Sequence, residues 1–399
     1  MASLFSTVKN NKDLVVFVVL NYVDKFLVFL LPLAVLYITQ DRDTYNSIEY
    51  VYSIANVISP FFVFFSSYAF YGYKLSSEES EADYIKAYRS YSTLFIIIVF
   101  FLGVCIALTT PIIVSSLSLL ISVMILIRFV YQQTINNNNV YYRLIDRPTH
   151  FLVYTILGSI LSVLLVLFFH HNSRAILWAF FFPQFVVSCL CLSSINRNFN
   201  IKNFIRYFVD SFKFAWPIVV NGTIVAFVMN YGKIYAYNYL DSYEMYNFSY
   251  IMRISLVIQM AHASLISFYG KELFVKGYSL SFYKKYCLVI GVAFVLSVIC
   301  LYIFNYLVTD KLTINLTTFL ILIYTLLFSL GASFEMWYSR MNNNRVILYV
   351  AILSCLVFLG LIFIVGVQSL MSLALYMVIY ALIYLILLIA VAKVKRVIV

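Results

Sequence analysis

Ionisable residues within long apolar runs are the first candidates for chemistry in this chain. Asp24 and Lys25 lie side by side in the stretch VLNYVDKFLVFLLP, and Lys233 and Arg253 lie in later apolar stretches. A charge at the centre of a membrane span costs at least about 2.5 kcal/mol, so it normally faces a watery cavity or a partner of opposite charge. These residues therefore predict a polar cavity or an intramembrane ion pair.

The spacing of the polar residues favours a stripe on one side of a helix. Asp24 and Lys25 are adjacent, so they point in different directions on a helix and pair poorly with each other. Asn21, one turn earlier, lies between these directions, and the segment from Asn230 to Lys233 repeats the pattern. Two interpretations remain open. Asp24 forms an ion pair with one of the two later cations, or three cations outnumber it in a cavity that suits an anionic passenger.

Other ionisable residues lie nearer the ends of their apolar runs or stand alone. For Arg128, Glu49 and Glu335, we expect the charged group to reach water along the side-chain stem. Arg128 is also a candidate for the cationic cavity, and Glu335 for ion coupling or an ion pair. His262 lies on about the opposite side of its helix from Arg253. We expect it to pack among helices, with a proton relay as the alternative.

Motifs for metal or nucleotide chemistry are weak. Asp41-Arg42-Asp43 is a formal D-x-D pair, which can hold a divalent metal, but two acids in a short polar turn are usually solvated. His170-His171 has no nearby carboxylate, no P-loop occurs, and the six cysteines lie in apolar runs without metal or disulfide spacing. We expect no metal site, no cofactor and no ATP hydrolysis.

The composition shows which elements must position these residues. The 399-residue chain is 64% hydrophobic and 11% charged, which is typical of a polytopic membrane protein. A bilayer core about 30 Å thick needs about 20 apolar residues per helix. On this basis we predict twelve spans, near residues 14–38, 48–71, 92–109, 112–133, 150–169, 176–195, 214–239, 244–268, 285–308, 314–335, 346–366 and 370–392. The first span is too long and too charged for a cleaved signal peptide.

The distribution of Lys and Arg predicts the orientation. With a cytoplasmic N-terminus, 20 of the 27 Lys and Arg residues fall in cytoplasmic segments, and only Arg42, Arg174 and Lys311 fall on the opposite side. The positive-inside rule therefore places both termini in the cytoplasm. It also accounts for the net charge of +11 without a nucleic-acid partner.

Repeated fragments predict two related halves. Tyr45-Asn46 before the second span matches Tyr246-Asn247 before the eighth, and Phe70-Tyr71-Gly72 matches Phe268-Tyr269-Gly270 at the ends of the same spans. We predict an N-terminal lobe at 1–195, a cytoplasmic linker at 196–213 and a C-terminal lobe at 214–399. Such a duplication is a transporter trait, because two similar bundles can rock around a site between them.

The assembled pattern resembles one exporter family. The resemblance rests on the first-span run DKFLVFLLPL (24–33), the Phe70-Tyr71-Gly72 end of the second span, Arg143 in the polar loop after the fourth, and Phe214-Ala215-Trp216-Pro217 opening the seventh. These features are similar to those of polysaccharide flippases of the O-antigen (Wzx) type, in the multidrug/oligosaccharidyl-lipid/polysaccharide (MOP) exporter superfamily. Ala215 replaces a glycine often seen there, so the subfamily is not assigned.

The resemblance implies a bacterial inner-membrane protein, all-α, with about 12 transmembrane helices in two pseudo-symmetric six-helix bundles that form a MATE-like V. It implies transfer of an undecaprenyl-pyrophosphate-linked oligosaccharide from the cytoplasmic to the periplasmic leaflet by alternating access. A polysaccharide polymerase and a chain-length regulator are the expected protein partners, and coupling to an H⁺ or Na⁺ gradient stays open. The implied site comprises substrate-binding Lys25, Lys233, Arg253 and Arg128, coupling or ion-pair residues Asp24, Glu335 and His262, and cavity amides Asn21 and Asn230.

Two alternatives remain. A multidrug or small-molecule exporter of the same superfamily shares the architecture, but such pumps favour acidic membrane residues, whereas the excess here is basic. A polysaccharide polymerase or glycosyltransferase would work on sizeable outward loops, and the longest predicted outward loop has only about ten residues, 39–48. We therefore expect a transporter rather than an enzyme.

Overall fold

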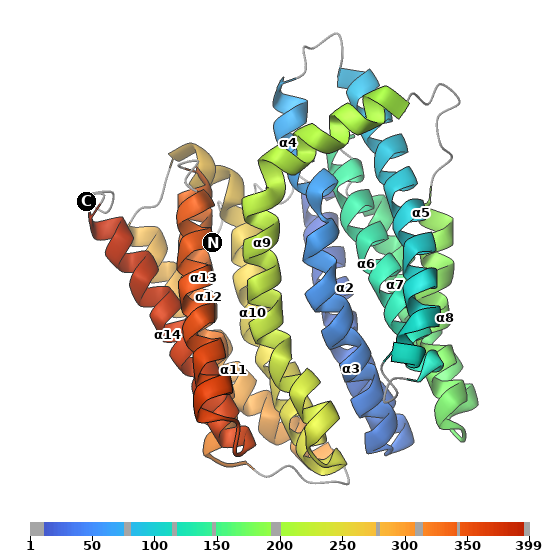
Figure 1. The fold of residues 1–399 in the computed structure, drawn as a ribbon, viewed down its shortest axis with the longest axis vertical. Coiled ribbons are helices and arrows are strands. Elements are labelled where there is room, and N and C mark those ends of the chain that lie inside the picture. The colour runs from blue at the N-terminus through green and yellow to red at the C-terminus, as the bar shows by residue number, and fades with distance from the viewer. Residues whose placement is uncertain are drawn as a thin grey trace. The chain divides into compact units, whose positions relative to one another are not determined.

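The computed structural model describes residues 12–75, 81–113, 118–145, 149–192, 201–276, 280–307, 314–340 and 344–394. Within these ranges the chain is helical apart from short links and contains no β-strand (Figure 1). The predicted all-α fold class is therefore confirmed. The chain divides into two compact units, Met1–Val219 and Val220–Val399. The boundary between them falls inside one long helix.

The first unit contains α2 (Lys12–Thr39), α3 (Arg42–Ile58), the 3₁₀-helix η1 (Ser59–Phe62), α4 (Phe64–Leu75), α5 (Glu81–Ile113), α6 (Leu119–Leu144), α7 (Thr149–Phe169), α8 (Ser173–Cys191) and the start of α9 (Ile201–Tyr239). The second unit contains the rest of α9, then α10 (Ser242–Lys276), α11 (Leu280–Leu307), α12 (Leu316–Arg340), α13 (Asn344–Gly360), the π-helix η3 (Leu361–Val365) and α14 (Leu370–Val394).

The side chains are distributed as a lipid environment requires. Nine helices in the described residues are long and apolar enough to cross a membrane. Large apolar side chains point outward from them, as Phe101 of α5, Phe168 of α7 and Leu288 of α11 do. Small polar groups are enclosed instead: the Ser162 hydroxyl of α7 donates to the Phe180 carbonyl of α8 at 3.0 Å. The protein is therefore a multi-pass membrane protein, with polar groups satisfied between helices.

The second predicted span, 48–71, is not one continuous α-helix. It is divided into α3, η1 and α4, with Pro60 near the start of η1. Proline lacks the N–H that would continue the helical hydrogen bonds, so the α-helix is interrupted here and backbone carbonyls at the break need other partners. The Gln133 amide of α6 donates to both the Ser59 carbonyl and the Ser59 hydroxyl at 2.8 Å. Tertiary packing thus stabilises the break.

Residues 201–213 also differ from the prediction, because most of the segment expected as a linker is helical. These residues form the first turns of α9, which continues without interruption into the predicted seventh span. Aromatic side chains explain the helix: Phe204, Tyr207 and Phe208 pack against Phe65 of α4. The predicted turn between the last two spans is confirmed, with Gly366 at φ +81° after η3.

The two units repeat the same internal packing scheme. In the first, α3 packs on α6, α5 on α6, α6 on α8 and α7 on α8. In the second, the corresponding pairs are α10 with α12, α11 with α12, α12 with α14 and α13 with α14. The central helices are therefore α6 and α12. The candidate residues Arg128 and Glu335 lie on these two helices.

Candidate functional site

Asp24 and Lys25 lie midway along α2, which packs against α7 and α3. Both side chains are partly buried, whereas Phe26 beside them is exposed. The Asp24 carboxyl interacts with the Thr155 hydroxyl of α7, and electrostatically with Lys25 and with Arg128. Its Oδ1 atom is buried and has no hydrogen-bond partner within the described part of the chain. The structure thus gives Asp24 neighbours within its own unit. Its pairing with a cation of the other unit stays a prediction.

Arg128 is enclosed by aromatic and amide groups from α3, α6 and α8. Its guanidinium carbon lies 3.9 Å from the centre of the Tyr52 ring and 5.5 Å from that of Tyr131. One of its nitrogens donates to Gln184 Oε1 at 3.2 Å, and its Nε has no hydrogen-bond partner in the ranges that the structure describes. A desolvated cation over an aromatic face gains about 2 kcal/mol or more. This site holds the cation inside the bundle.

The expectation that Arg128 and Glu49 reach water from the ends of their spans is wrong. The Arg128 side chain is only 8% exposed, and Glu49 on α3 is completely buried. Their positions along the apolar runs were predictable from the sequence, but the enclosure of Arg128 by groups from α3, α6 and α8 was not. Asn21, whose backbone is helical, has a side chain outside the described part of the structure.

The second unit buries two of the predicted cations. Lys233 on α9 is 6% exposed and Arg253 on α10 is 3% exposed. Asn230 is also buried, and its amide donates to the Ala226 carbonyl of its own helix at 2.7 Å. Gly232 on α9 leaves room for the Phe248 ring of α10, because a Cβ atom at this position would overlap the ring.

Glu335 connects three helices of the second unit. The Tyr384 hydroxyl of α14 donates to Glu335 Oε1 at 2.6 Å, and the Asn221 amide of α9 also hydrogen-bonds to the carboxyl. Tyr384 stacks on Tyr380 with a ring separation of 5.9 Å. The carboxyl therefore sits among neutral hydrogen-bond donors. Like Arg128, it is held by the bundle rather than extended toward the end of its span.

His262 is part of a hydrogen-bonded chain between α10, α11 and α12. Its Nδ1 lies 2.7 Å from the Tyr286 hydroxyl, which in turn donates to the Ser329 carbonyl at 2.6 Å. The tyrosine has a single proton, so His262 must donate from Nδ1. The expected packing among helices is observed, and the histidine has the additional role of joining them.

The weak motifs have structural roles. Asp41 caps α3, accepting from the N–H groups of Asp43 and Thr44, and it also accepts from the Ser173 hydroxyl at the start of α8. Burial raises its pKa, but these hydrogen bonds outweigh the burial and lower the pKa below its ordinary value. The described residues contain no group of three or more His, Cys, Asp or Glu able to hold a metal ion.

Sequence reasoning missed the neutral partners of the buried charges. These are Tyr52 and Gln184 around Arg128, Tyr384 and Asn221 around Glu335, and Tyr286 beside His262. The sequence does contain a signal for one of these partners, Tyr384. Tyrosines recur every four residues at 376, 380 and 384 and so form a polar stripe on the last helix. The other partners come from distant segments and have no signal of their own.

These features define a class, namely a polytopic α-helical membrane protein with ionisable groups buried in its spanning helices. Solved structures of transporters share its fold. A lipid II flippase, MurJ, in an inward closed conformation matches with a TM-score of 0.60 and 14% identity, covering 95% of this chain and 87% of that chain. An inward-facing multidrug resistance MATE family transporter of the MOP superfamily matches with a TM-score of 0.58 and 12% identity, covering 92% and 93%. A MATE structure in the bent conformation matches at 0.56 with 12% identity, covering 94% of each chain.

At these identities the similarity establishes the fold alone. No family model matches the sequence, and no curated protein matches it either. The chain thus has the fold of MATE transporters and of MurJ.

Proposed function

We propose that this protein is a flippase that transfers an undecaprenyl-pyrophosphate-linked oligosaccharide from the cytoplasmic to the periplasmic leaflet by alternating access. The observation that carries the proposal is the burial of basic groups in spanning helices, with Lys233 and Arg253 almost fully enclosed in the second unit. Burying a charge in a membrane span is costly and marks a functional site by default. A pyrophosphate head is an anion that such cations would recognise.

In this proposal Lys25 and Arg253 contact the pyrophosphate, and Lys233 assists nearer the outer side. Arg128 was also predicted to bind substrate. Its contacts with Tyr52 and Gln184 favour a positioning role, in which it holds α3, α6 and α8 together beside Asp24.

Coupling to an H⁺ or Na⁺ gradient is assigned to the partly buried acids Asp24 and Glu335. Asp24 has an unpartnered oxygen, and the Thr155 hydroxyl beside it already donates to the Leu152 carbonyl at 2.9 Å. A hydroxyl has one proton, so Thr155 can accept from a protonated Asp24 while keeping that bond. Glu335 and His262 are the corresponding candidates in the second unit.

The comparisons support a transporter of this general kind. One neighbour is described as a lipid II flippase, which moves a lipid-linked substrate, and others as multidrug transporters. A bacterial inner membrane, cytoplasmic termini, and a polymerase with its chain-length regulator as partners follow from the same proposal. They depend on the resemblance and on the distribution of Lys and Arg.

A multidrug exporter is the second candidate, because MATE transporters share the fold. Cationic drugs favour acidic binding residues, whereas the buried charges here are mostly basic. Deletion of the gene should therefore leave the sensitivity of the cells to cationic drugs unchanged. A marked loss of resistance to cationic drugs in the deletion strain would favour the exporter instead.

Deletion of the gene tests the flippase proposal directly. Full-size lipid-linked repeat units should accumulate on the cytoplasmic leaflet. Accumulation on the periplasmic leaflet would point to the polymerase, and incomplete units would point to a glycosyltransferase.

Neutralising the proposed head-binding cations tests their role. Lys25→Ala and Arg253→Ala should each abolish surface polysaccharide at wild-type protein levels. Lys213→Ala and Arg206→Ala are matched controls, because these exposed residues lie on the first turns of α9. Normal polysaccharide from both cavity variants would remove the assignment.

A further inference from the structure

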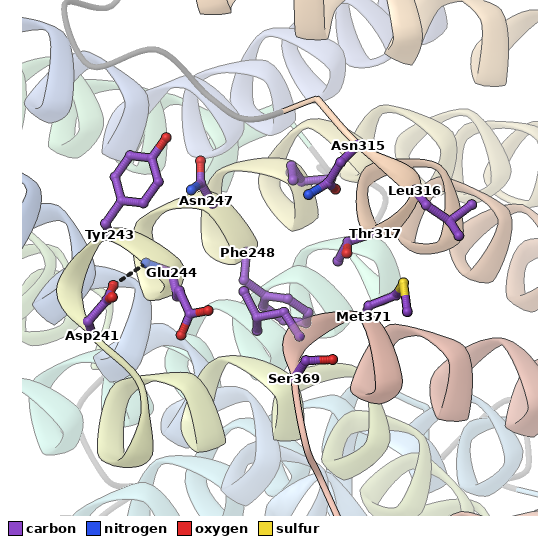
Figure 2. A pocket seen from close by; sticks show the side chains of 12 residues that line it. Asp241, Tyr243, Glu244, Asn247, Phe248, Asn315, Leu316, Thr317, Ser369 and Met371 are labelled. Carbon is purple, nitrogen blue, oxygen red and sulfur yellow. Dashed lines mark hydrogen bonds between the residues drawn. The ribbon is translucent and has the colours of Figure 1, made fainter.

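A pocket of about 630 Å³ lies in the second unit, where α10, α12 and α14 begin (Figure 2). Its walls come from the first turns of α10, from residues 315–317 and from residues 369–371. None of the residues assigned to head binding or to coupling lines it. A pocket of this size is within the range of about 300–1,000 Å³ that small-molecule ligands occupy.

Helix caps build the walls of the pocket. Asp241 accepts from the Glu244 N–H at 2.7 Å, Asn315 accepts from the Thr318 N–H at 3.4 Å, and Ser369 accepts from the Ser372 N–H at 3.3 Å. Each cap fixes its segment by short-range bonds, so the three segments do not need a ligand to adopt their conformations.

One buried amide in the pocket points to a ligand. Asn247 is only 8% exposed and lines the pocket, yet its Oδ1 atom has no hydrogen-bond partner among the residues that the structure describes. A buried polar group without a partner is unfavourable, because it has lost its hydrogen bonds to water without replacing them. A ligand with hydroxyl groups would offset this cost by hydrogen-bonding to the Asn247 amide.

The charges around the pocket nearly balance. Asp241 and Glu244 supply two negative charges, and none of the described lining residues is basic. Three helix N-termini, each equivalent to about +0.5 charge, together offset most of this negative charge. The charges of the described lining residues therefore disfavour a phosphate or an acidic sugar and fit an uncharged ligand.

The remaining walls suit a molecule with both polar and apolar surfaces. The Tyr243 ring borders the pocket beside the carboxylates and amides, and Leu316 and Met371 give it an exposed apolar rim. Carboxylates accept hydrogen bonds from hydroxyls, amides both accept from and donate to hydroxyls, and an aromatic face contacts C–H groups. Sugars present both kinds of group.

We propose that this pocket binds uncharged sugar units of the transported glycan, separately from the cations that hold the pyrophosphate. The choice of sugar as ligand rests on the proposed function. The predicted orientation places α10, α12 and α14 with their first turns outward, so the pocket would receive the glycan on the side of release.

The test uses the purified protein in nanodiscs and saturation-transfer difference NMR. The probe is the host's own surface polysaccharide cleaved by mild acid into oligosaccharides, which are separated by anion exchange into neutral and acidic fractions. We expect saturation transfer to the neutral fraction, and Asn247→Ala should reduce it at least fivefold. Met371→Trp, which fills the pocket from an exposed position, should do the same without altering the buried packing.

Asn238→Ala is the matched control, because Asn238 is an exposed asparagine at the end of α9 and bonds only within its helix. It should leave the signal unchanged. The proposal is overturned if the neutral fraction gives no signal or if both pocket variants keep the signal. It is also overturned if the acidic fraction, or a simple diamine used as a cationic probe, binds more strongly at the same site.

The two proposals fail separately. If the pocket variants bind and export normally while Lys25→Ala and Arg253→Ala stop export, the sugar site is wrong and the flippase proposal stands. If deletion causes no accumulation of lipid-linked units but pocket-dependent sugar binding persists, the flippase proposal fails instead.

Discussion

The bond between Tyr384 and Glu335 gives the sharpest prediction about the protonation state of a half-buried acid. The Tyr384 hydroxyl donates to Glu335 Oε1 at 2.6 Å, across the interface of α14 and α12. If the acid is ionised, the bond is charge-assisted. If the acid is protonated, the bond is neutral. The energy of this one bond therefore reports whether Glu335 carries a proton. A residue that couples transport to a proton gradient must be able to bind one.

The magnitudes separate these two states. Hydrogen bonds to charged groups contribute about 1.5–3 kcal/mol to stability. Neutral bonds between membrane helices average about 0.6 kcal/mol in double-mutant cycles. A double-mutant cycle of Tyr384→Phe with Glu335→Leu measures the energy of the full bond. Glu335→Gln keeps a hydrogen-bond acceptor but cannot ionise. The cycle with Glu335→Gln then measures the charged part alone.

The assay is equilibrium unfolding in mixed micelles of SDS and a mild detergent. A coupling energy above about 1.5 kcal/mol indicates an ionised carboxylate, and one near about 0.6 kcal/mol indicates a protonated acid. Tyr338→Phe is the control, because Tyr338 bonds across the same two helices to the Leu388 carbonyl at 2.8 Å. It should show no coupling to either change at Glu335. A coupling energy of zero for Tyr384→Phe with Glu335→Leu would refute the geometry.

Three further predictions concern other contacts. The folded-state pKa of Asp41 is lowered, so the stabilisation from this carboxylate is present above the unfolded-state pKa of about 3.9 and is lost as the pH falls through the folded-state pKa. Asp41→Asn should therefore flatten the dependence of thermal stability on pH between about 2 and 5. An unchanged slope would contradict this prediction. Gly232→Ala should destabilise the protein by about 1–3 kcal/mol through overlap with Phe248, and Phe248→Leu should restore part of the loss in denaturant unfolding. Tyr286→Phe should cost about 1–3 kcal/mol because it leaves His262 Nδ1 without its acceptor, and a smaller loss in a His262→Phe background would confirm the pair.

Much of the fold could be predicted from the sequence because the bilayer imposes a simple rule. A helix must be about 20 apolar residues long to cross, so uncharged runs determine the spanning segments. The turn at Gly366 followed from a run too long for one span. The break at Pro60 did not, because the Ser59 carbonyl beside it is satisfied by Gln133 from a distant helix. The helical start of α9 also depended on tertiary contacts, since its aromatic residues are stabilised by Phe65.

The sequence by itself determined that this is an all-α membrane protein and which ionisable residues lie inside its spans. Burial cost makes such residues conspicuous wherever they occur in an apolar run. Only the tertiary structure decided what surrounds them. Arg128 is stacked on Tyr52 and Glu335 accepts from Tyr384, although sequence position suggested that both would reach water. The reason is that the partners come from other helices, and neutral tyrosines and amides carry no charge by which a sequence could identify them.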